Sequence, residues 1–262
     1  MTGSMTRQAA LGMATAAVLA GMAVAAPITN PAAAAPTAGP KPAFTGFGAP
    51  GDSGTNEPAP TAPDAGPAAG SPNVAPLESM LLTADELGST LGVTGLNISK
   101  TATSLYNSDS ITPVSCAGSY SAAESAAYSA VSPQGVLRKY AHDSNSHNQI
   151  TQAVVALSSK REAIKYINSA YAGWKRCAGQ TVSEKTSDGV LSLTNRTPEL
   201  NDSQTVITLI QNDDKGVLMC ERAMADVRNV IIDTLYCGTG TASGQGAAVA
   251  EAIARKATIR TV

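Results

Sequence analysis

The chain has 262 residues, of which 43% are hydrophobic, 15% charged and 4% aromatic, so it is long enough for one or two modest domains. Its 18 Lys and Arg nearly balance 20 Asp and Glu, and a formal net charge of −2 argues against nucleic acid as a partner. The two histidines, His142 and His147, come without a Cys-x-x-Cys pair or a phosphate-binding loop. The sequence therefore assigns no catalytic residue, no metal ligand and no cofactor.

Residues 1–25 have the features of a secretory signal peptide. Arg7 is the one charged side chain, the stretch 8–25 is uncharged and rich in Ala, Leu, Val and Met, and Ala23-Val24-Ala25 fits the small-x-small cleavage pattern. The apolar stretch is just long enough to span a bilayer, but its many Ala and Gly residues drive insertion poorly. We therefore expect cleavage, which leaves no stable transmembrane segment. Retention as a membrane anchor is the alternative.

Residues 26–79 are predicted to form a disordered Pro/Ala/Gly-rich linker. Of the chain's 15 prolines, 12 lie between Pro27 and Pro76, among Ala, Gly, Ser and Thr. Such a stretch buries too little apolar surface to offset the entropy of ordering it. Both phenylalanines of the chain, Phe44 and Phe47, fall in this stretch and offer a short segment for docking on a protein partner.

Two capping boxes mark helix starts in the predicted folded part, residues 80–262. Thr83 and Glu86 open a short helix that Gly92 ends. Ser159 and Glu162 open a longer helix, whose apolar stripe predicts one buried face. The stripe consists of Ala163, Ile167, Ala170, Tyr171 and Trp174, and Cys177 continues it.

Apolar alternation and turn residues predict the remaining elements. In chain order these are an edge strand at 96–99, a short Ala-rich helix at 121–130, strands at 136–140, 150–157, 181–184, 190–194, 205–211, 216–225 and 230–237, and a helix at 244–256 that carries the pair Glu251–Arg255. A polar loop at 141–148 holds both histidines. This order of elements predicts an α+β fold, with an antiparallel sheet packed by helices.

Four cysteines in the folded part of an exported chain predict two disulfides. Cys220 and Cys237 lie symmetrically about a hairpin turn at Arg228-Asn229, which places them opposite each other on a non-hydrogen-bonded pair. This favours a Cys220–Cys237 bridge and leaves Cys116–Cys177 as the second. A zinc site would need short paired spacings, and a catalytic thiol would leave one cysteine over.

Several segments, by their order and spacing, carry a resemblance to a known family. They are Leu81-Leu82-Thr83-Ala84-Asp85-Glu86-Leu87, Ser115-Cys116-Ala117-Gly118-Ser119-Tyr120, Trp174-Lys175-Arg176-Cys177-Ala178, Cys220-Glu221-Arg222-Ala223 and Tyr236-Cys237-Gly238. On these segments, residues 80–262 resemble the PknH-like extracellular sensor domains of mycobacterial serine/threonine kinases. The resemblance implies an α+β domain with an antiparallel sheet, the disulfide pairing given above, and a cleft that binds an unidentified extracellular ligand. It transfers no ligand-binding residue.

We therefore predict an exported, non-enzymatic ligand-binding or sensor-type domain at the cell envelope. Its expected partner is an unidentified extracellular small molecule or envelope component. The alternative is a secreted hydrolase that acts on envelope material through the loop with His142, Asp143 and His147. A solvated loop is the simpler interpretation of those residues, because positions five apart do not share one helical face. The glycine-rich loop at 238–244 offers backbone amides to an anion, or is a plain strand-to-helix turn.

Overall fold

The computed structural model describes residues 74–259, except 109, 145–146, 187–188, 202, 204 and 241–242. The predicted signal peptide, almost all of the predicted linker, and Phe44 and Phe47 therefore lie outside the described residues. Within the described part, no helix is long and apolar enough to cross a membrane.

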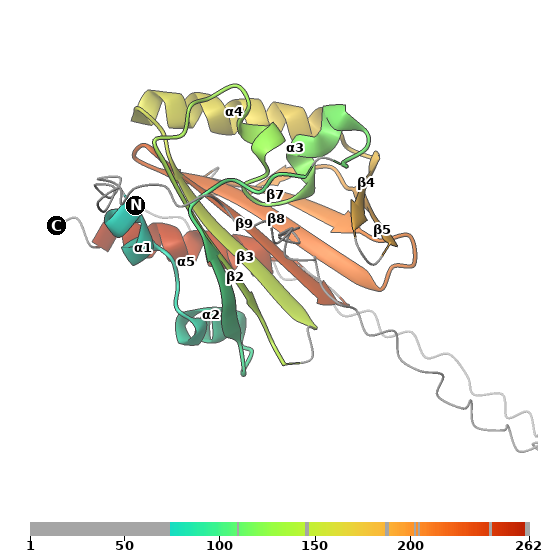
Figure 1. Cartoon of the computed structure of the whole chain (residues 1–262), viewed down its shortest axis with the longest axis horizontal. Coiled ribbons are helices and arrows are strands. Elements are labelled where there is room, and N and C mark those ends of the chain that lie inside the picture. Colours follow the sequence, from blue (N-terminus) through green and yellow to red (C-terminus); the bar gives the residue numbers. More distant parts are fainter. Residues whose placement is uncertain are drawn as a thin grey trace, which may run out of the picture. The chain divides into compact units, whose positions relative to one another are not determined.

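An antiparallel sheet forms the body of the domain (Figure 1), and among the described residues it has nine strands. The strands are β1 (Asn97–Ala102), β2 (Gly135–His142), β3 (Asn148–Ala156), β4 (Thr181–Thr186), β5 (Gly189–Asn195), β6 (Glu199–Leu200), β7 (Val206–Asn212), β8 (Leu218–Val227) and β9 (Val230–Thr239). Their order across the sheet is β1-β2-β3-β9-β8-β7-β5-β4, and the two-residue β6 pairs with β7. The predicted fold class, with helices on an antiparallel sheet, is thus confirmed.

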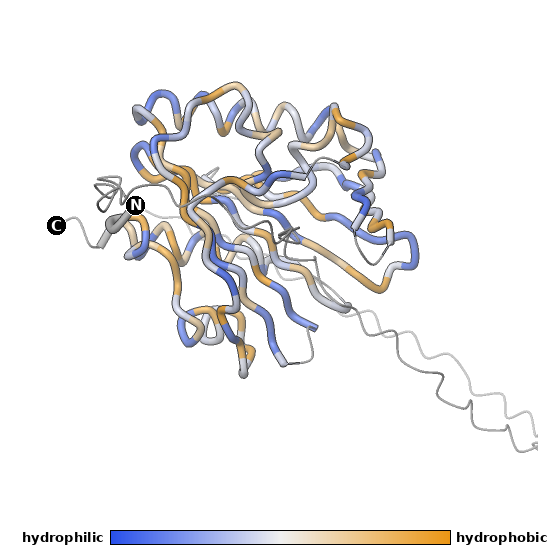
Figure 2. The backbone as a smooth tube through the Cα atoms, viewed as in Figure 1, coloured by the Kyte–Doolittle hydropathy of each residue, from blue (hydrophilic) through white to orange (hydrophobic). Residues whose placement is uncertain are grey.

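Helices cover both faces of the sheet (Figure 1). One face carries α1 (Val74–Met80), α2 (Ala84–Leu91) and α5 (Gln245–Ile259). The other carries α4 (Lys160–Arg176) and, beside it, the short α3 (Ala117–Tyr120), with the 3₁₀ turns η1 (Val114–Cys116) and η2 (Ser125–Tyr128) next to α3 in the chain. Figure 2 shows that the turn between β7 and β8 is hydrophilic.

The caps explain where the helices begin. The Thr83 hydroxyl accepts the Glu86 N–H, the Glu86 carboxylate accepts the Thr83 N–H, and Gly92 ends α2 in the left-handed region, as predicted. At α4 the Ser159 hydroxyl accepts the Glu162 N–H at 3.2 Å. The second capping box is nevertheless incomplete, because the Glu162 carboxylate reaches back to Ser158 instead, to its N–H at 3.0 Å and its hydroxyl at 2.5 Å.

The β8–β9 hairpin turns at Arg228 and Asn229, as the sequence predicts. Val227 pairs with Val230, and counting outward Cys220 pairs with Cys237. Their Cα atoms are 4.0 Å apart and the two residues form a disulfide. The second disulfide joins Cys116 to Cys177, which confirms the predicted pairing. It ties the start of α3 to the end of α4.

Two stretches differ from the sequence prediction. The expected helix at 121–130 is one 3₁₀ turn, because Ala123 has a φ of 53°, which breaks helical geometry, and its N–H donates to the Asp233 carboxylate. Conversely, α1 occupies residues that the sequence analysis assigned to the linker. Leu77 anchors α1, since this side chain is buried in the core although it follows a proline-rich stretch.

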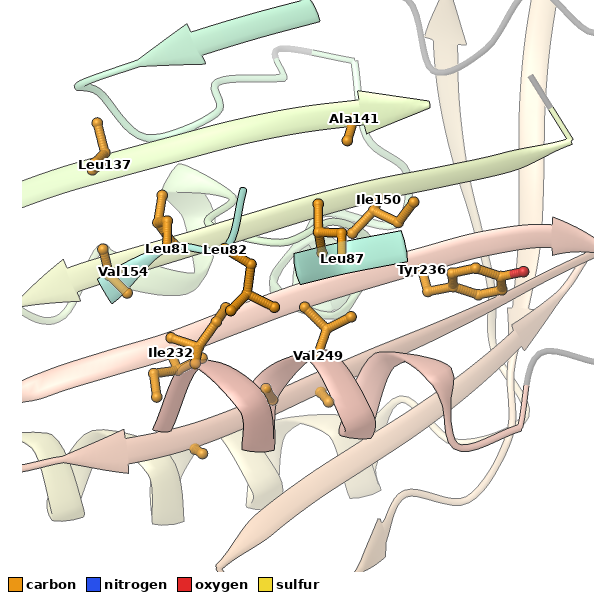
Figure 3. Packing of buried hydrophobic residues seen from close by; sticks show 14 of the residues in the cluster. Leu81, Leu82, Leu87, Leu137, Ala141, Ile150, Val154, Ile232, Tyr236 and Val249 are labelled. Carbon is orange, nitrogen blue, oxygen red and sulfur yellow. The ribbon is translucent and has the colours of Figure 1, made fainter. Parts of the chain in front are cut away.

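The core is divided by the sheet. On the face of α1, α2 and α5, an aliphatic cluster includes Leu81, Leu82, Leu87, Ile232 and Val249 (Figure 3). On the face of α4 lie two further clusters, one around Tyr128, Tyr166 and Trp174, the other around both disulfides and Tyr120. Aromatic and polar groups are therefore concentrated on the α4 face.

Candidate functional site

A groove of about 420 Å³ lies between α4 and the chain segment 114–131, and we call it the α4 groove. Clefts that hold small ligands commonly enclose about 300 to 1,000 Å³, so its size fits a small molecule. Its lining residues are Val114, Ser115, Cys116, Gly118, Ser119, Ala126, Ala127, Ser129, Ala130 and Val131 on one side, and Glu162, Lys165, Tyr166, Ser169, Ala170, Gly173, Trp174, Arg176 and Cys177 on the other.

Successive turns of α4 place two rows of side chains at the groove, because residues three or four apart share a helix face. The inner row of Tyr166, Ala170 and Trp174 packs toward the sheet, and Trp174 is only 2% exposed. The outer row of Lys165, Ser169, Gly173 and Arg176 forms the rim. The predicted buried stripe of this helix is confirmed for Ala163 and Trp174, while Tyr166, which the sequence analysis missed, is also buried.

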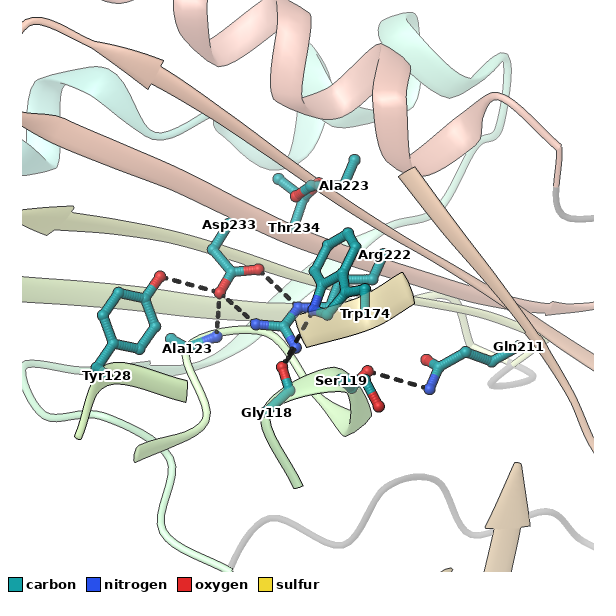
Figure 4. Close-up of polar contacts among 10 residues, drawn as sticks. All are labelled: Gly118, Ser119, Ala123, Tyr128, Trp174, Gln211, Arg222, Ala223, Asp233 and Thr234. Atoms are coloured by element: carbon teal, nitrogen blue, oxygen red, sulfur yellow. Dashed lines mark hydrogen bonds and ion pairs between the residues drawn. The ribbon is translucent and has the colours of Figure 1, made fainter. Parts of the chain in front are cut away.

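A buried ion pair lies beneath the groove (Figure 4). Arg222 on β8 and Asp233 on β9 are both fully buried, with Nη2 and Oδ2 2.8 Å apart and Nε and Oδ1 3.0 Å apart. Although burial alone lowers the pKa of Arg222, the Asp233 carboxylate raises it above its ordinary value. The Trp174 ring covers the guanidinium, whose carbon is 5.1 Å from the ring centroid.

This ion pair also positions the segment opposite α4. The Asp233 carboxylate accepts the Ala123 N–H at 2.8 Å and the Tyr128 hydroxyl at 3.0 Å. The Gly118 carbonyl accepts Arg222 Nη1 at 2.6 Å and Trp174 Nε1 at 3.3 Å. Because these contacts fix the segment at several points along its length, the groove wall is held by directional bonds as well as by the Cys116–Cys177 disulfide.

A second polar cluster contacts the middle of the same segment, at Glu124 and Ser125. Glu184 Oε1 accepts the hydroxyls of Tyr106 at 2.7 Å and Ser108 at 2.6 Å. Glu124 is fully buried; its Oε1 accepts the Ser125 hydroxyl at 3.3 Å, but its Oε2 accepts no hydrogen bond from a described residue. Burial raises the pKa of Glu124 above its ordinary value, against the opposing effect of backbone N–H groups that hydrogen-bond to it.

The loop with His142, Asp143 and His147, which the alternative interpretation makes a hydrolytic site, is held by internal hydrogen bonds. Asp143 Oδ1 accepts the His147 N–H at 2.8 Å, and Asp143 Oδ2 accepts the Asn148 side-chain amide at 2.7 Å. His142 Nδ1 lies 2.8 Å from the Asp143 main-chain oxygen, and His147 is exposed. The described contacts thus use the Asp143 carboxylate to close the β2–β3 turn, and they give no support to a hydrolase.

The amides at the start of α5 already have an anionic partner within the protein. Glu221 on β8 is buried, and its Oε2 accepts the Gly246 N–H at 3.0 Å. Gly246 has no room for a side chain, because a Cβ would lie 2.5 Å from the Glu221 carbonyl oxygen. The glycine-rich loop at 238–244 therefore leads into a helix start that an internal carboxylate caps, which favours the strand-to-helix turn over an anion site.

Among the described residues, no three His, Cys, Asp or Glu side chains are grouped so as to hold a metal ion. The sequence analysis named several groove residues, but only as parts of a cap, a helix stripe, a disulfide or a family segment. It assigned none of them to a binding site, and it missed the ion pair. One signal was present. A hairpin that turns at Arg228-Asn229 places Arg222 and Asp233 on the same face as the cysteine bridge, diagonally opposite, so that two opposite charges in apolar strands predict a buried pair.

The family model of the PknH-like extracellular domain matches residues 72–256 of this chain. Serine/threonine-protein kinase PknH of Mycobacterium bovis is 25% identical over 167 residues, which make up 62% of this chain and 28% of that kinase. The protein of the same name from Mycobacterium tuberculosis is also 25% identical over 167 residues, which make up 26% of its length. The chain thus spans less than a third of the curated relatives that it matches.

The crystal structure of the extracellular domain of PknH from Mycobacterium tuberculosis has the same fold. It superposes with a TM-score of 0.65 at 23% sequence identity, covering 71% of this chain and 96% of that chain. With a family model that matches well over half of its residues, this chain belongs to the PknH-like extracellular domain family.

Proposed function

We propose that this chain is an extracytoplasmic, non-enzymatic sensor domain that binds a small extracellular ligand in the α4 groove. The observation that carries the proposal is the construction of the groove. Its two walls are separate pieces of chain, α4 and residues 114–131, joined by the Cys116–Cys177 disulfide and by hydrogen bonds to the Arg222–Asp233 pair. Pre-ordered walls lower the entropy cost of binding a ligand between them.

Three further findings support this role. The family is that of an extracellular domain, and the relatives of this chain carry that domain as part of a kinase. Two disulfides among the described residues suit an oxidising compartment outside the cytoplasm. The hydrophobic start of the sequence is typical of an export signal.

The test is to find the ligand on the protein itself. The full chain is purified from cells that export it, and native mass spectrometry compares the wild type with Ala130→Phe, which fills the groove from an exposed position. Ser132→Phe, also exposed and outside the groove lining, is the matched control. We expect a small molecule that stays on the wild type and on Ser132→Phe but not on Ala130→Phe. A ligand-free wild type, or equal retention by both variants, would contradict the proposal.

A further inference from the structure

The two sides of the α4 groove differ in charge. The side formed by residues 114–131 contributes only small, apolar or hydroxyl-bearing side chains and backbone, among them Ala126, Ala127 and Ala130. The side formed by α4 contributes Glu162, Lys165 and Arg176. A ligand in the groove therefore meets an apolar wall on one side and ionised groups on the other.

The charged groups on the α4 side are unequal in number, two basic and one acidic. The Glu162 carboxylate accepts both the N–H and the hydroxyl of Ser158. Lys165 and Arg176 are exposed, and neither forms an ion pair with a carboxylate in the described part of the chain. Lys165 is nevertheless close enough to Glu162 to help the Ser158 hydrogen bonds lower the pKa of that carboxyl. The groove lining thus carries two positive charges against one negative charge, with Arg176 as the more independent cation.

The Arg176 guanidinium lies beside Gly173. A Cβ at Gly173 would be 3.7 Å from Arg176 Nη2, an ordinary contact distance, and Gly173 itself lines the groove. Lys165 and Gly173 are eight residues apart, or about 12 Å along the helix, with Ser169 midway. The two long side chains therefore approach the groove from either side of the Ser169 hydroxyl.

The whole helix is also strongly basic. Of the chain's 18 Lys and Arg, α4 contains five, at 160, 161, 165, 175 and 176, against one Glu, although the chain as a whole is acidic. Lys175 points elsewhere, since its Nζ lies 4.4 Å from the Tyr171 ring centroid, and it does not line the groove. The local field favours an anion beside α4, and the two groove-lining cations determine where that anion binds.

We propose that the α4 groove binds an organic anion with a slender apolar body. Its acidic group, a phosphate or a carboxylate, contacts Lys165, Ser169 and Arg176, while its apolar body packs against the alanine wall and the floor above Trp174. This inference rests on the proposed function, because it specifies the chemistry of the ligand that the groove takes. Lys165 and Arg176 are specificity-determining residues in this arrangement.

Intrinsic tryptophan fluorescence reports on binding in this groove, because Trp174 is the single tryptophan of the chain and lines the groove. The full chain is titrated with three probes below their micelle concentrations: decyl phosphate, decyltrimethylammonium and decyl maltoside. Inorganic phosphate is the fourth probe. We expect decyl phosphate to change Trp174 emission saturably, and the cationic and neutral amphiphiles to bind at least about tenfold more weakly. We expect inorganic phosphate alone to have no effect at the same concentration.

Variants of the basic residues test where the acidic group of the ligand binds. Lys165→Gln and Arg176→Gln should each weaken decyl phosphate binding roughly three- to tenfold, the range of one partly exposed charge-assisted hydrogen bond. Lys175→Gln removes the same charge from the same helix and should change the affinity by less than about twofold. Equal effects of Lys165→Gln and Lys175→Gln, or binding of decyltrimethylammonium as tight as that of decyl phosphate, would overturn the inference.

The same experiment separates this inference from the proposed function. If Ala130→Phe abolishes binding of all three amphiphiles but none is preferred, the groove is a ligand site and the anion preference is wrong. If Ala130→Phe binds decyl phosphate like the wild type, the groove is not the site, and both proposals fail. An equal response to inorganic phosphate would show a simple anion site, and would overturn the role of the apolar wall.

Discussion

The two faces of the sheet are held together by different means. Under α1, α2 and α5 the contacts are mostly aliphatic, with Leu87, Ile232 and Val249 fully buried (Figure 3). Under α4 the buried groups include an ion pair, Arg222–Asp233, that bonds to three residues of the segment 114–131 (Figure 4). Aliphatic burial has no preferred direction, whereas an ion pair with hydrogen bonds fixes the atoms that it touches.

The difference matters for the groove because its wall has little regular structure. The segment 114–131 contains one four-residue α-helix and two 3₁₀ turns, so it cannot position itself by helix packing alone. Its place is set by bonds to Asp233 and Arg222 and by the Cys116–Cys177 bridge. We infer that changes in these polar contacts affect the groove, whereas changes in polar contacts on the α5 face leave it intact.

The largest expected effect comes from breaking the buried ion pair. Asp233→Asn keeps the side-chain shape but leaves the Arg222 guanidinium buried without its counter-ion, which typically costs about 3 to 5 kcal/mol in the free energy of unfolding. Urea unfolding would measure this loss. The double variant Arg222→Met with Asp233→Leu should recover only part of it. No charge is then left unpaired, but the Ala123 N–H and the Tyr128 hydroxyl lose their acceptor and the Gly118 carbonyl loses a donor. A loss below about 1 kcal/mol for Asp233→Asn would mean that the pair does not organise this face.

The two disulfides allow a direct comparison of groove and sheet. Replacing Cys116 and Cys177 by Ser should lower the free energy of unfolding by about 2 to 5 kcal/mol, and replacing Cys220 and Cys237 should do so by less, because the bridge closes a shorter loop. Only the first change releases the two walls of the groove. We therefore expect Trp174 emission in the native state to move to longer wavelength in that variant alone, and an equal shift in both would contradict the comparison.

Much of the fold was predictable, because it follows local patterns. Alternating strands, the Ser159 cap and the stripe of α4 are read from neighbouring residues, and the position of Cys220 opposite Cys237 follows from counting outward from a turn. The path of residues 121–128 was not predictable. The left-handed Ala123 is stabilised by a bond to Asp233, 110 positions away in sequence, so an Ala-rich stretch that favours a helix is overridden by a distant partner.

The candidate site was hidden from sequence analysis for the same reason. Groove walls of Ala, Ser and Gly carry no chemical signature, and the basic rim on α4 resembles an ordinary solvated helix face. Similarly, α1 was missed because Leu77 follows a proline-rich stretch, and only its burial against the sheet shows why a helix forms there. The proposed site depends on which segments meet in space, a property that spacing along the chain does not express.

A smaller effect is expected from the buried carboxyl of Glu124. Burial raises its pKa above the unfolded value, so the native state holds a proton that the unfolded chain has already lost. The stabilising effect is complete below the unfolded pKa and is lost as the pH rises through the folded pKa. Glu124→Gln removes this dependence. The stability of the wild type relative to Glu124→Gln should therefore be greater at pH 4 than at pH 7.

Thermal unfolding at a series of pH values measures this difference. Glu199→Gln, which alters an exposed carboxylate on β6, is the control and should leave the pH profile of stability unchanged. A Glu124→Gln profile parallel to that of the wild type would show that the Glu124 carboxyl has the same pKa in the native and unfolded states. Its hydrogen bonds would then fully compensate its burial, although Oε2 accepts none from a described residue.

The smallest effect tests the α5 face. Lys256 Nζ lies 2.6 Å from Glu86 Oε2 and 2.9 Å from the Leu81 carbonyl oxygen, and the bond to Lys256 is the largest cause of the lowered pKa of Glu86. Its stabilising effect is present above the unfolded pKa of Glu86 and is lost as the pH falls. Because both side chains are partly exposed, Lys256→Met should cost only about 0.5 to 1 kcal/mol at pH 7, and less at pH 3.

Arg255→Met is the matched control on the same helix, since its pair with Glu251 is 3.7 Å long and largely exposed, and its loss should cost close to nothing. Neither variant should move Trp174 emission, because α5 is separated from the groove by the sheet (Figure 1). If Lys256→Met destabilised the domain as much as Asp233→Asn, the α5 face would depend on directional polar contacts as the α4 face does. The contrast between an aliphatic face that supports the sheet and a polar face that shapes the groove would then be wrong.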